Sequence, residues 1–238
     1  AQVVVGSDSL LRGRGSDRLA FLDAFAAVLS ARGMLDAGAV ATTRSGTAPS
    51  DTVLRVASPP LAALLPHFLK PSQNQHGELW LRHIARQVTG VGRADSGAAV
   101  VRRRLRAWGV PEGAVHIADG SGMSRHNLLS ADALTRVLAS MLASEHATVF
   151  RDALPVAGVD GTLERRLAGT AVAGRFAGKT GSLDRVRALS GYLTDAAGRP
   201  LIVVLLINHF AGSAASAEAL LDHLLQRVAS LGAPLPVR

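Results

Sequence analysis

The chain has 238 residues, of which 48% are hydrophobic and 4% aromatic, and it carries a formal net charge of +8. This length and composition allow a full core, and no run reaches the roughly 18 to 20 apolar residues that a membrane span needs. The chain has no cysteine, which excludes disulfides and thiolate metal sites, and its eight histidines form no cluster with metal-ligand spacing. We therefore expect a globular protein without a metal or other cofactor.

The first 57 residues predict a small unit of one helix and two strands. Residues 16–32 place apolar side chains at helical spacing, and Gly33 then favours the end of the helix. Residues 40–43 and 52–56 follow the pattern of short strands. We divide the chain into residues 1–57 and residues 58–238.

Helices are predicted next, over residues 60–69, 77–85 and about 98–108. The last of them contains the basic cluster Arg102–Arg106, which could contact nucleic-acid phosphates. Cations in the last turn of a helix also favour the helix dipole, and a chain with 4% aromatic residues has few rings that could stack on bases. We therefore expect no nucleic-acid partner. Trp80 and Trp108 are predicted to pack in the core.

The second half of the chain predicts a hairpin and its covering helices. A helix is expected over residues 128–143 with a cap near Ser130, and Asp160–Thr162 is typical of a turn and helix cap. Val186–Leu193 and Leu201–Ile207 predict two strands. The second strand is apolar at every position, so we expect both of its faces to be covered. Residues 214–231 have the spacing of a covering helix.

Lys179 is unusual because it is one of only two lysines, with Lys70, against 24 arginines. An ammonium with a tunable pKa suits a site that holds an anion and contacts a catalytic hydroxyl. Residues 173–180 fit a loosened phosphate loop, but a phosphate loop opens a helix, and a strand is predicted next. In a second interpretation, Lys179-Thr180-Gly181 lies on an edge strand beside an acyl-transfer site and works with a Ser-x-Asn element. Ser72-Gln73-Asn74, between two predicted helices, supplies that element, although a lone Ser-x-Asn is more often a helix cap.

Four stretches in this order resemble the D-alanyl-D-alanine carboxypeptidase/endopeptidase family, the low-molecular-mass class C penicillin-binding proteins. They are residues 58–74, 119–127, 154–163 and 179–192. The resemblance implies an α/β fold of the α+β type, in which helices flank an antiparallel sheet as in serine β-lactamases and transpeptidases. It implies that residues 1–57 are the tail of an inserted accessory domain and that residues 58–238 are the C-terminal part of the penicillin-binding domain. It also implies a periplasmic or other extracytoplasmic enzyme of peptidoglycan metabolism that acts on stem peptides and is inhibited by β-lactams.

The resemblance further implies a role for each site residue. Ser72 would pass a proton to the leaving amine, Lys179 would orient the Ser72 hydroxyl and attract the substrate carboxylate, and Asn74 would hold the acyl-side amide. The Ser182 backbone N–H would supply half of an oxyanion hole. The implied substrate-binding residues are Thr180, Gly181, Ser182, Met123 and Arg125. From its own properties, Met123 is as compatible with core packing, and His126, without a Gly-x-Ser-x-Gly elbow, is expected to be structural.

The chain departs from the family pattern at two places. Gln73 replaces the usual aspartate, and no Ser-x-x-Lys occurs, since His67 and Phe176 stand three residues before the two lysines. The family uses that serine as its nucleophile and the lysine beside it as a base. We therefore expect an N-terminal portion outside these residues to carry the nucleophile. Two alternatives remain open: a non-catalytic pseudo-enzyme that binds peptidoglycan peptides or partner proteins, and a nucleotide-binding protein.

Overall fold

The computed structural model describes residues 30–33 and 58–231, and the chain divides into two compact units, residues 1–58 and 59–238. In the first unit, Ser30 and Ala31 are helical and Gly33 has a φ of 66°, as expected for a helix stop. The strands predicted over residues 40–43 and 52–56 lie outside the described residues. Among the residues that are described, no helix is long and apolar enough to cross a membrane.

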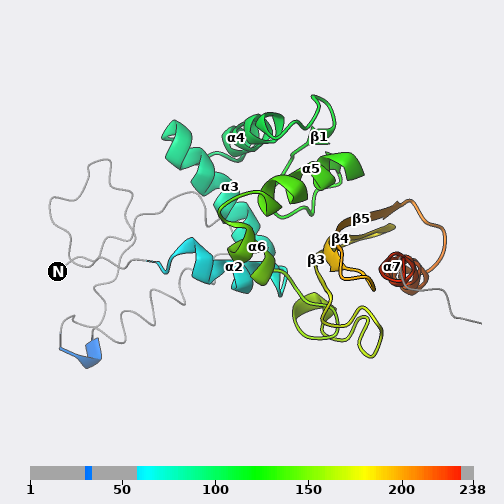
Figure 1. Ribbon diagram of the computed structural model, residues 1–238. Coiled ribbons are helices and arrows are strands. Elements are labelled where there is room, and N and C mark those ends of the chain that lie inside the picture. The colour runs from blue at the N-terminus through cyan, green and yellow to red at the C-terminus, as the bar shows by residue number, and fades with distance from the viewer. Residues whose placement is uncertain (1–29, 34–57, 232–238) are drawn as a thin grey trace, which may run out of the picture. The chain divides into compact units, whose positions relative to one another are not determined.

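The second unit begins with three helices (Figure 1). Helix α2 spans Leu61–Leu69, α3 spans Asn74–Thr89, and α4 spans Ala94–Ala107. Helices α3 and α4 pack closely, because Gly97 of α4 lies against the backbone of Leu81, where a Cβ atom would not fit. Helices α2 and α3 flank the turn that contains Ser72.

The two tryptophans are half-buried, so their predicted place in the core is wrong. The Trp80 ring packs edge-on against Phe68, with ring centroids 4.7 Å apart. The Trp108 ring lies under the Arg104 guanidinium at 6.0 Å. The Trp80 ring therefore packs between α2 and α3, and the Trp108 ring packs against its own helix α4.

A small two-stranded sheet corrects the predicted start of the next helix. Val115–His116 form β1 and pair antiparallel with β2, which consists of Leu128–Leu129. Helix α5 therefore spans Ala131–Leu142, and not residues 128–143, because the Ser130 hydroxyl accepts a hydrogen bond from the Ala133 N–H at 3.1 Å and caps the helix there. The short helix α6, Ala147–Asp152, and the 3-10 helix η2, Gly161–Leu163, follow.

The main sheet is antiparallel, with strand order β3-β4-β5. Strand β3 spans Phe176–Leu183, β4 spans Val186–Thr194, and β5 spans Pro200–Asn208. Helix α7, Ala214–Ala229, packs against β4 on one face, and α5 packs against β5 on the other (Figure 1). The largest fully buried side chains of the α7 face are Phe176, Leu163, Leu189, Leu193, Leu221 and Leu225. The α+β fold with helices on both sheet faces is thus confirmed.

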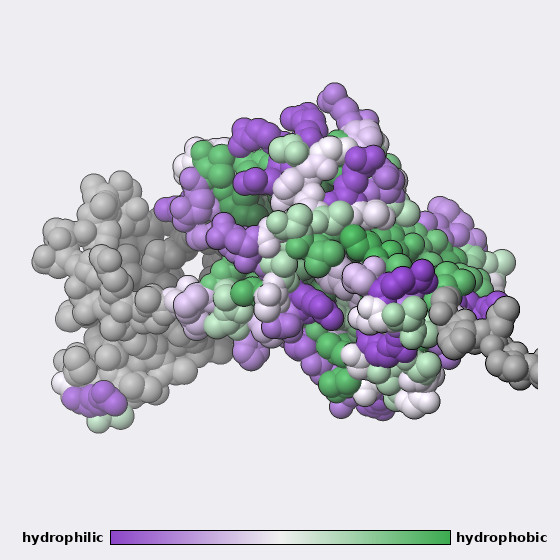
Figure 2. All heavy atoms as spheres, viewed as in Figure 1, coloured by the Kyte–Doolittle hydropathy of each residue, from purple (hydrophilic) through white to green (hydrophobic). Residues whose placement is uncertain are grey.

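Strand β5 is less covered than its apolar sequence predicts. Only Val203 is buried, whereas the residues from Leu201 to Ile207 around it are half-buried. The strand lies at the edge of the sheet in the described part of the chain. Figure 2 shows apolar side chains gathered over the region where Figure 1 places β5.

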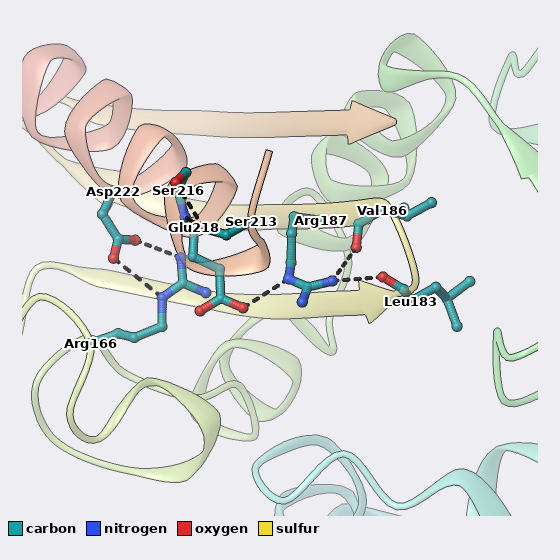
Figure 3. Close-up of polar contacts among 8 residues, drawn as sticks. All are labelled: Arg166, Leu183, Val186, Arg187, Ser213, Ser216, Glu218 and Asp222. Atoms are coloured by element: carbon teal, nitrogen blue, oxygen red, sulfur yellow. Dashed lines mark hydrogen bonds and ion pairs between the residues drawn. The ribbon is translucent and has the colours of Figure 1, made fainter. Parts of the chain in front are cut away.

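Two ion pairs fix α7 to the rest of the unit (Figure 3). The Arg166 guanidinium contacts the Asp222 carboxylate at 2.5 Å, and Arg187 Nε donates to Glu218 Oε1 at 2.8 Å. Arg187 also donates to the carbonyls of Leu183 and Val186, at 2.6 and 2.8 Å. One half-buried guanidinium therefore holds both ends of the β3–β4 turn against α7, which fixes the end of β3 that follows Lys179.

The only tyrosine of the chain, Tyr192, gives a direct probe of this core. Its buried hydroxyl donates to the Leu138 carbonyl at 2.8 Å, and burial, opposed by the charge of Arg151, raises its pKa from 10.0 to about 12. The unfolded chain loses the proton first, so stability should fall between pH 10 and 12. We expect the tyrosinate ultraviolet band of the folded chain to develop near pH 12. We expect Tyr192→Phe to lose about 1 kcal/mol of unfolding free energy at neutral pH. Titration of the folded chain near pH 10 would contradict this account.

Candidate active site

Ser72 lies in the turn between α2 and α3 and has a φ of 60°, in the left-handed region that non-glycine residues rarely adopt. The Gln73 N–H closes the turn by donating to the Phe68 carbonyl at 3.0 Å. Asn74 is the first residue of α3, so the predicted loop between two helices contains Ser72 and Gln73 but ends before Asn74. The turn presents the Ser72 hydroxyl toward β3.

Lys179 extends from β3, where it is paired with Ser190 of β4. Its ammonium donates to Ser72 Oγ at 2.7 Å and to the Thr180 carbonyl at 2.8 Å. The predicted proximity of the Ser72 hydroxyl and the Lys179 ammonium is therefore confirmed. No carboxylate lies within ion-pair distance of Lys179 among the described residues, and burial lowers the pKa of its amine. The site thus joins a hydroxyl to an amine that loses its proton more readily than an exposed lysine.

Apart from the Thr180 carbonyl, the remaining residues of the two motifs make no hydrogen bond to this pair in the described part of the chain. The Thr180 hydroxyl donates to Thr162 Oγ1 at 2.9 Å, and Gly181 lies opposite Ala188. Asn74 and Ser182 are exposed. In the described part of the chain, no hydrogen bond connects the side chain of either to Ser72 or Lys179. Both side chains are therefore available to a ligand.

The glycine-rich segment Asp119–Asn127 is folded around its own polar side chains. The Asp119 carboxylate accepts hydrogen bonds from the backbone N–H groups of Gly122 and Ser124, at 2.7 and 2.6 Å, and from Asn127 Nδ2 at 2.7 Å. Glu78 of α3 accepts a 2.7 Å bond from the Ser121 hydroxyl and further bonds from two backbone N–H groups. The segment is thus fixed to the helix that begins at Asn74.

Met123 and Arg125 lie on the outside of this segment. Met123 is 54% exposed, so its interpretation as a core residue is wrong. Arg125 Nη2 donates to the Asp184 carboxylate and carbonyl, at 3.1 and 3.2 Å, and so reaches the β3–β4 turn two residues beyond Ser182. The exposed His126 uses its backbone carbonyl to accept a bond from His116 Nδ1 at 2.7 Å, and the structural role of its side chain stays a prediction.

Sequence patterns do not assign site roles to Lys70, Asp160 and Thr162. These residues connect the turn that contains Ser72 to strand β3. The Lys70 ammonium contacts the Asp160 carboxylate at 2.5 Å, and Thr162 Oγ1 accepts a hydrogen bond from the Thr180 hydroxyl. Asp160 is the N-cap residue of η2, as predicted, but its carboxylate binds Lys70 and the Val156 N–H and makes no cap bond to η2. The rarity of lysine in this chain is the one sequence signal that points to Lys70.

The structure contradicts a phosphate loop at residues 173–180. Lys179 lies in the middle of β3, and the next element is β4, so these residues do not open a helix as a phosphate loop does. In the described residues, no group of histidine and acidic side chains could hold a metal ion. A cavity of about 560 Å³ lies near the start of β3 and α6 and is lined by Arg151, Asp152 and Arg175 among others, but by none of the predicted site residues.

Comparison with known proteins gives the same family as the resemblance of the four sequence stretches. The model of the D-Ala-D-Ala carboxypeptidase 3 (S13) family matches residues 10–228. A D-alanyl-D-alanine carboxypeptidase of Actinomadura sp. strain R39 is 37% identical over 143 residues, which are 58% of this chain and 27% of the relative. Carboxypeptidase DacB of Mycolicibacterium smegmatis is 33% identical over 195 residues, which are 79% of this chain and 42% of the relative.

The solved structure of penicillin binding protein 4 (dacB) from Haemophilus influenzae, in complex with a β-lactam, has a TM-score of 0.70 and 28% identity to this chain. The match covers 85% of this chain and 50% of the other. The chain thus spans half or less of the length of these relatives.

Proposed function

Because the chain belongs to the D-Ala-D-Ala carboxypeptidase 3 (S13) family, we propose that it is the C-terminal part of a serine-type D-Ala-D-Ala carboxypeptidase/endopeptidase. Its substrates are peptidoglycan stem peptides, and it works outside the cytoplasm, where those peptides are. It requires no metal or other cofactor. Residues 1–57 are the tail of an inserted accessory domain, and residues 58–238 complete the catalytic domain.

One observation carries this proposal, the 2.7 Å hydrogen bond from Lys179 to Ser72 Oγ. An amine whose pKa is lowered by burial can exchange a proton with the hydroxyl, and the hydroxyl can pass a proton to the leaving amine of the substrate. While protonated, Lys179 also attracts the terminal carboxylate, which the Thr180 and Ser182 hydroxyls bind. The Ser182 N–H supplies one oxyanion donor, and Asn74 holds the acyl-side amide. Met123 and Arg125 border the bound peptide.

The nucleophile belongs to a portion of the enzyme that is not among these 238 residues, since no Ser-x-x-Lys occurs in them. Strand β5 supports such a portion, because it has an unpaired edge in the described chain and half-buried apolar side chains. An added strand would pair with this edge and cover those side chains. β-Lactams acylate the completed site, in keeping with the β-lactam complex of the Haemophilus influenzae relative.

The second candidate is a non-catalytic protein that binds peptidoglycan peptides or partner proteins through the same residues. The absence of Ser-x-x-Lys favours it, because Ser72, Lys179 and Asn74 can bind a peptide without breaking it. The two candidates differ only in turnover.

Release of D-alanine from a peptide that ends in D-Ala-D-Ala decides between them. We expect the protein with its upstream segment restored to release D-alanine, and we expect Ser72→Ala to lower kcat about 10²- to 10⁴-fold, the usual contribution of a general acid–base group. Asp95→Asn, on the exposed face of α4, is the matched control and should leave kcat unchanged. Binding of the peptide by the restored protein without any release of D-alanine would favour the non-catalytic candidate.

A further inference from the structure

The segment between Leu154 and Leu163 lies between the two halves of the candidate site. One half is the Ser72 turn after α2, and the other is strand β3 with Lys179. The two halves are more than a hundred residues apart in the sequence. Among the described residues, Ser72 and Lys179 take part in only one bond between the two halves, which is the bond to each other. The geometry of the pair therefore depends on what connects its two supports.

The first connection is an ion pair with well-placed partners. The Lys70 ammonium contacts Asp160 Oδ2 at 2.5 Å and donates to the Leu154 carbonyl at 3.1 Å. The other carboxylate oxygen, Asp160 Oδ1, accepts the Val156 N–H at 2.9 Å. The Lys70 side chain is 24% exposed and that of Asp160 is 37% exposed, so water screens the pair only in part. Lys70 stands two residues before Ser72, and its position limits where the turn can lie.

The second connection joins the two backbones. The Thr162 N–H donates to the Lys70 carbonyl at 3.0 Å, and Gly161 has a φ of 58° beside it. A Cβ atom at Gly161 would come within 2.7 Å of that carbonyl oxygen. Glycine is therefore required for this approach, and the segment touches the chain just before Ser72 with both backbone and side chain.

The third connection reaches β3. The Ala157 N–H donates to the Phe176 carbonyl and the Gly178 N–H donates to the Pro155 carbonyl, both at 2.9 Å, which fixes the segment to the start of the strand. Further along, the Thr180 hydroxyl donates to Thr162 Oγ1 at 2.9 Å. Residues 154–163 thus bond to β3 on both sides of Lys179.

We infer that residues 154–163, locked by the Lys70–Asp160 ion pair, form a strut that sets the position of the Ser72 hydroxyl relative to the Lys179 amine. Lys70 and Asp160 are positioning residues, since they touch neither Ser72 Oγ nor Lys179 Nζ. The left-handed Ser72 backbone is a conformation that persists only when its surroundings hold it. These contacts support the strut itself, whereas its effect on catalysis rests on the proposed function.

The two lysines allow a test on the 238-residue chain itself. Selective isotope labelling of lysine side chains gives two nuclear magnetic resonance signals, and Lys70→Arg, which keeps the cation, identifies the one from Lys179. In Asp160→Asn we expect the pKa of Lys179 to rise toward that of an exposed lysine, because the Ser72 turn relaxes and water reaches the amine. Electrostatics alone has the opposite sign, since removal of a negative charge makes a nearby ammonium lose its proton more easily.

Two further variants complete this test. Asp184→Asn removes a carboxylate from the β3–β4 turn without touching the strut and should not raise the pKa of Lys179. Thr162→Val changes no charge and removes only the Thr180 contact, so a rise in that variant cannot be electrostatic, and it serves even if Asp160→Asn does not fold. An unchanged or lower pKa of Lys179 in both Asp160→Asn and Thr162→Val would overturn the inference.

A second measurement separates the strut from the proposed function. In the protein with its upstream segment restored, Asp160→Asn should slow acylation by penicillin about 10- to 100-fold, the effect expected when a catalytic group moves by about 1 Å. If the restored parent protein is not acylated at all, the proposed function fails, whereas the lysine titration still decides whether the strut exists. Normal acylation of Asp160→Asn together with a raised pKa of Lys179 would overturn the catalytic consequence alone.

Discussion

Incubation of the purified 238-residue chain with a fluorescent penicillin should leave it unlabelled, whereas the same chain with its upstream segment restored should be labelled stoichiometrically. Covalent capture needs a serine that attacks the lactam carbonyl and a base beside it. The Ser-x-x-Lys that supplies both in the family is absent from these residues. The difference between the two proteins should therefore be all or none on the time scale of the experiment.

The Ser72–Lys179 contact does not replace the missing pair. Ser72 has an amine at 2.7 Å, but in the proposed mechanism its hydroxyl faces the leaving group and not the carbonyl carbon. A nucleophile without attack geometry forfeits most of the large advantage of oriented reactants. Ser121 is no better placed, because its hydroxyl donates to Glu78 at 2.7 Å.

Intact-mass spectrometry after incubation with penicillin measures the adduct directly. The control is the restored protein with the serine of its Ser-x-x-Lys replaced by alanine, which should stay unlabelled like the isolated chain. A stoichiometric adduct on Ser72, Ser121 or Ser182 of the isolated chain would mean that these residues contain their own nucleophile.

Sequence patterns predicted those helices and strands that the spacing of apolar residues and the capping residues determine locally. Strands β4 and β5, helix α7 and the Ser130 cap follow from apolar spacing and capping chemistry, and the structure agrees closely with the predicted bounds. The start of α5 was misplaced because Leu128–Leu129 is equally apolar in a strand, and only its pairing with β1, at Val115–His116, decides between strand and helix. The coverage of β5 failed for a similar reason, since burial depends on neighbours that a strand's own sequence does not contain.

The candidate site, like the fold, could be predicted only in part. The Ser72–Lys179 pair followed from two motifs taken together with the family resemblance, since a lone Ser-x-Asn is more often a helix cap, and their contact is confirmed. The strut was not predicted, because Asp160 in an Asp-Gly-Thr sequence has the local pattern of a cap, and its real partner stands 90 residues earlier. The roles of Asn74, Ser182, Met123 and Arg125 stay predictions, since each depends on a ligand.

Lys179→Met should separate stability from activity in the protein with its upstream segment restored. We expect acylation by penicillin to slow about 10²- to 10³-fold, because the substrate loses a cation for its carboxylate and Ser72 loses its proton partner. Lys179→Arg is the matched control: it keeps the charge, so the penicillin should still bind, but a guanidinium does not give up a proton near neutral pH, and acylation should stay slow. Equal acylation rates in the three proteins would remove Lys179 from the mechanism.

Lys179→Met should also be more stable than the parent chain at neutral pH. Burial lowers the pKa of Lys179 in the folded state, and no carboxylate among the described residues offsets the cost of holding its charge there. Below the folded pKa the amine is charged in both states and this cost is fully present. As the pH rises from the folded toward the unfolded pKa, the folded chain releases its proton first and the cost disappears. Thermal unfolding should therefore show an advantage of Lys179→Met that shrinks across this window, and the ionisation of Tyr192, which is common to both proteins, cancels in the difference. A variant that is less stable than the parent at pH 7 would mean that the hydrogen bonds of Lys179 to Ser72 and to the Thr180 carbonyl outweigh the cost of desolvation.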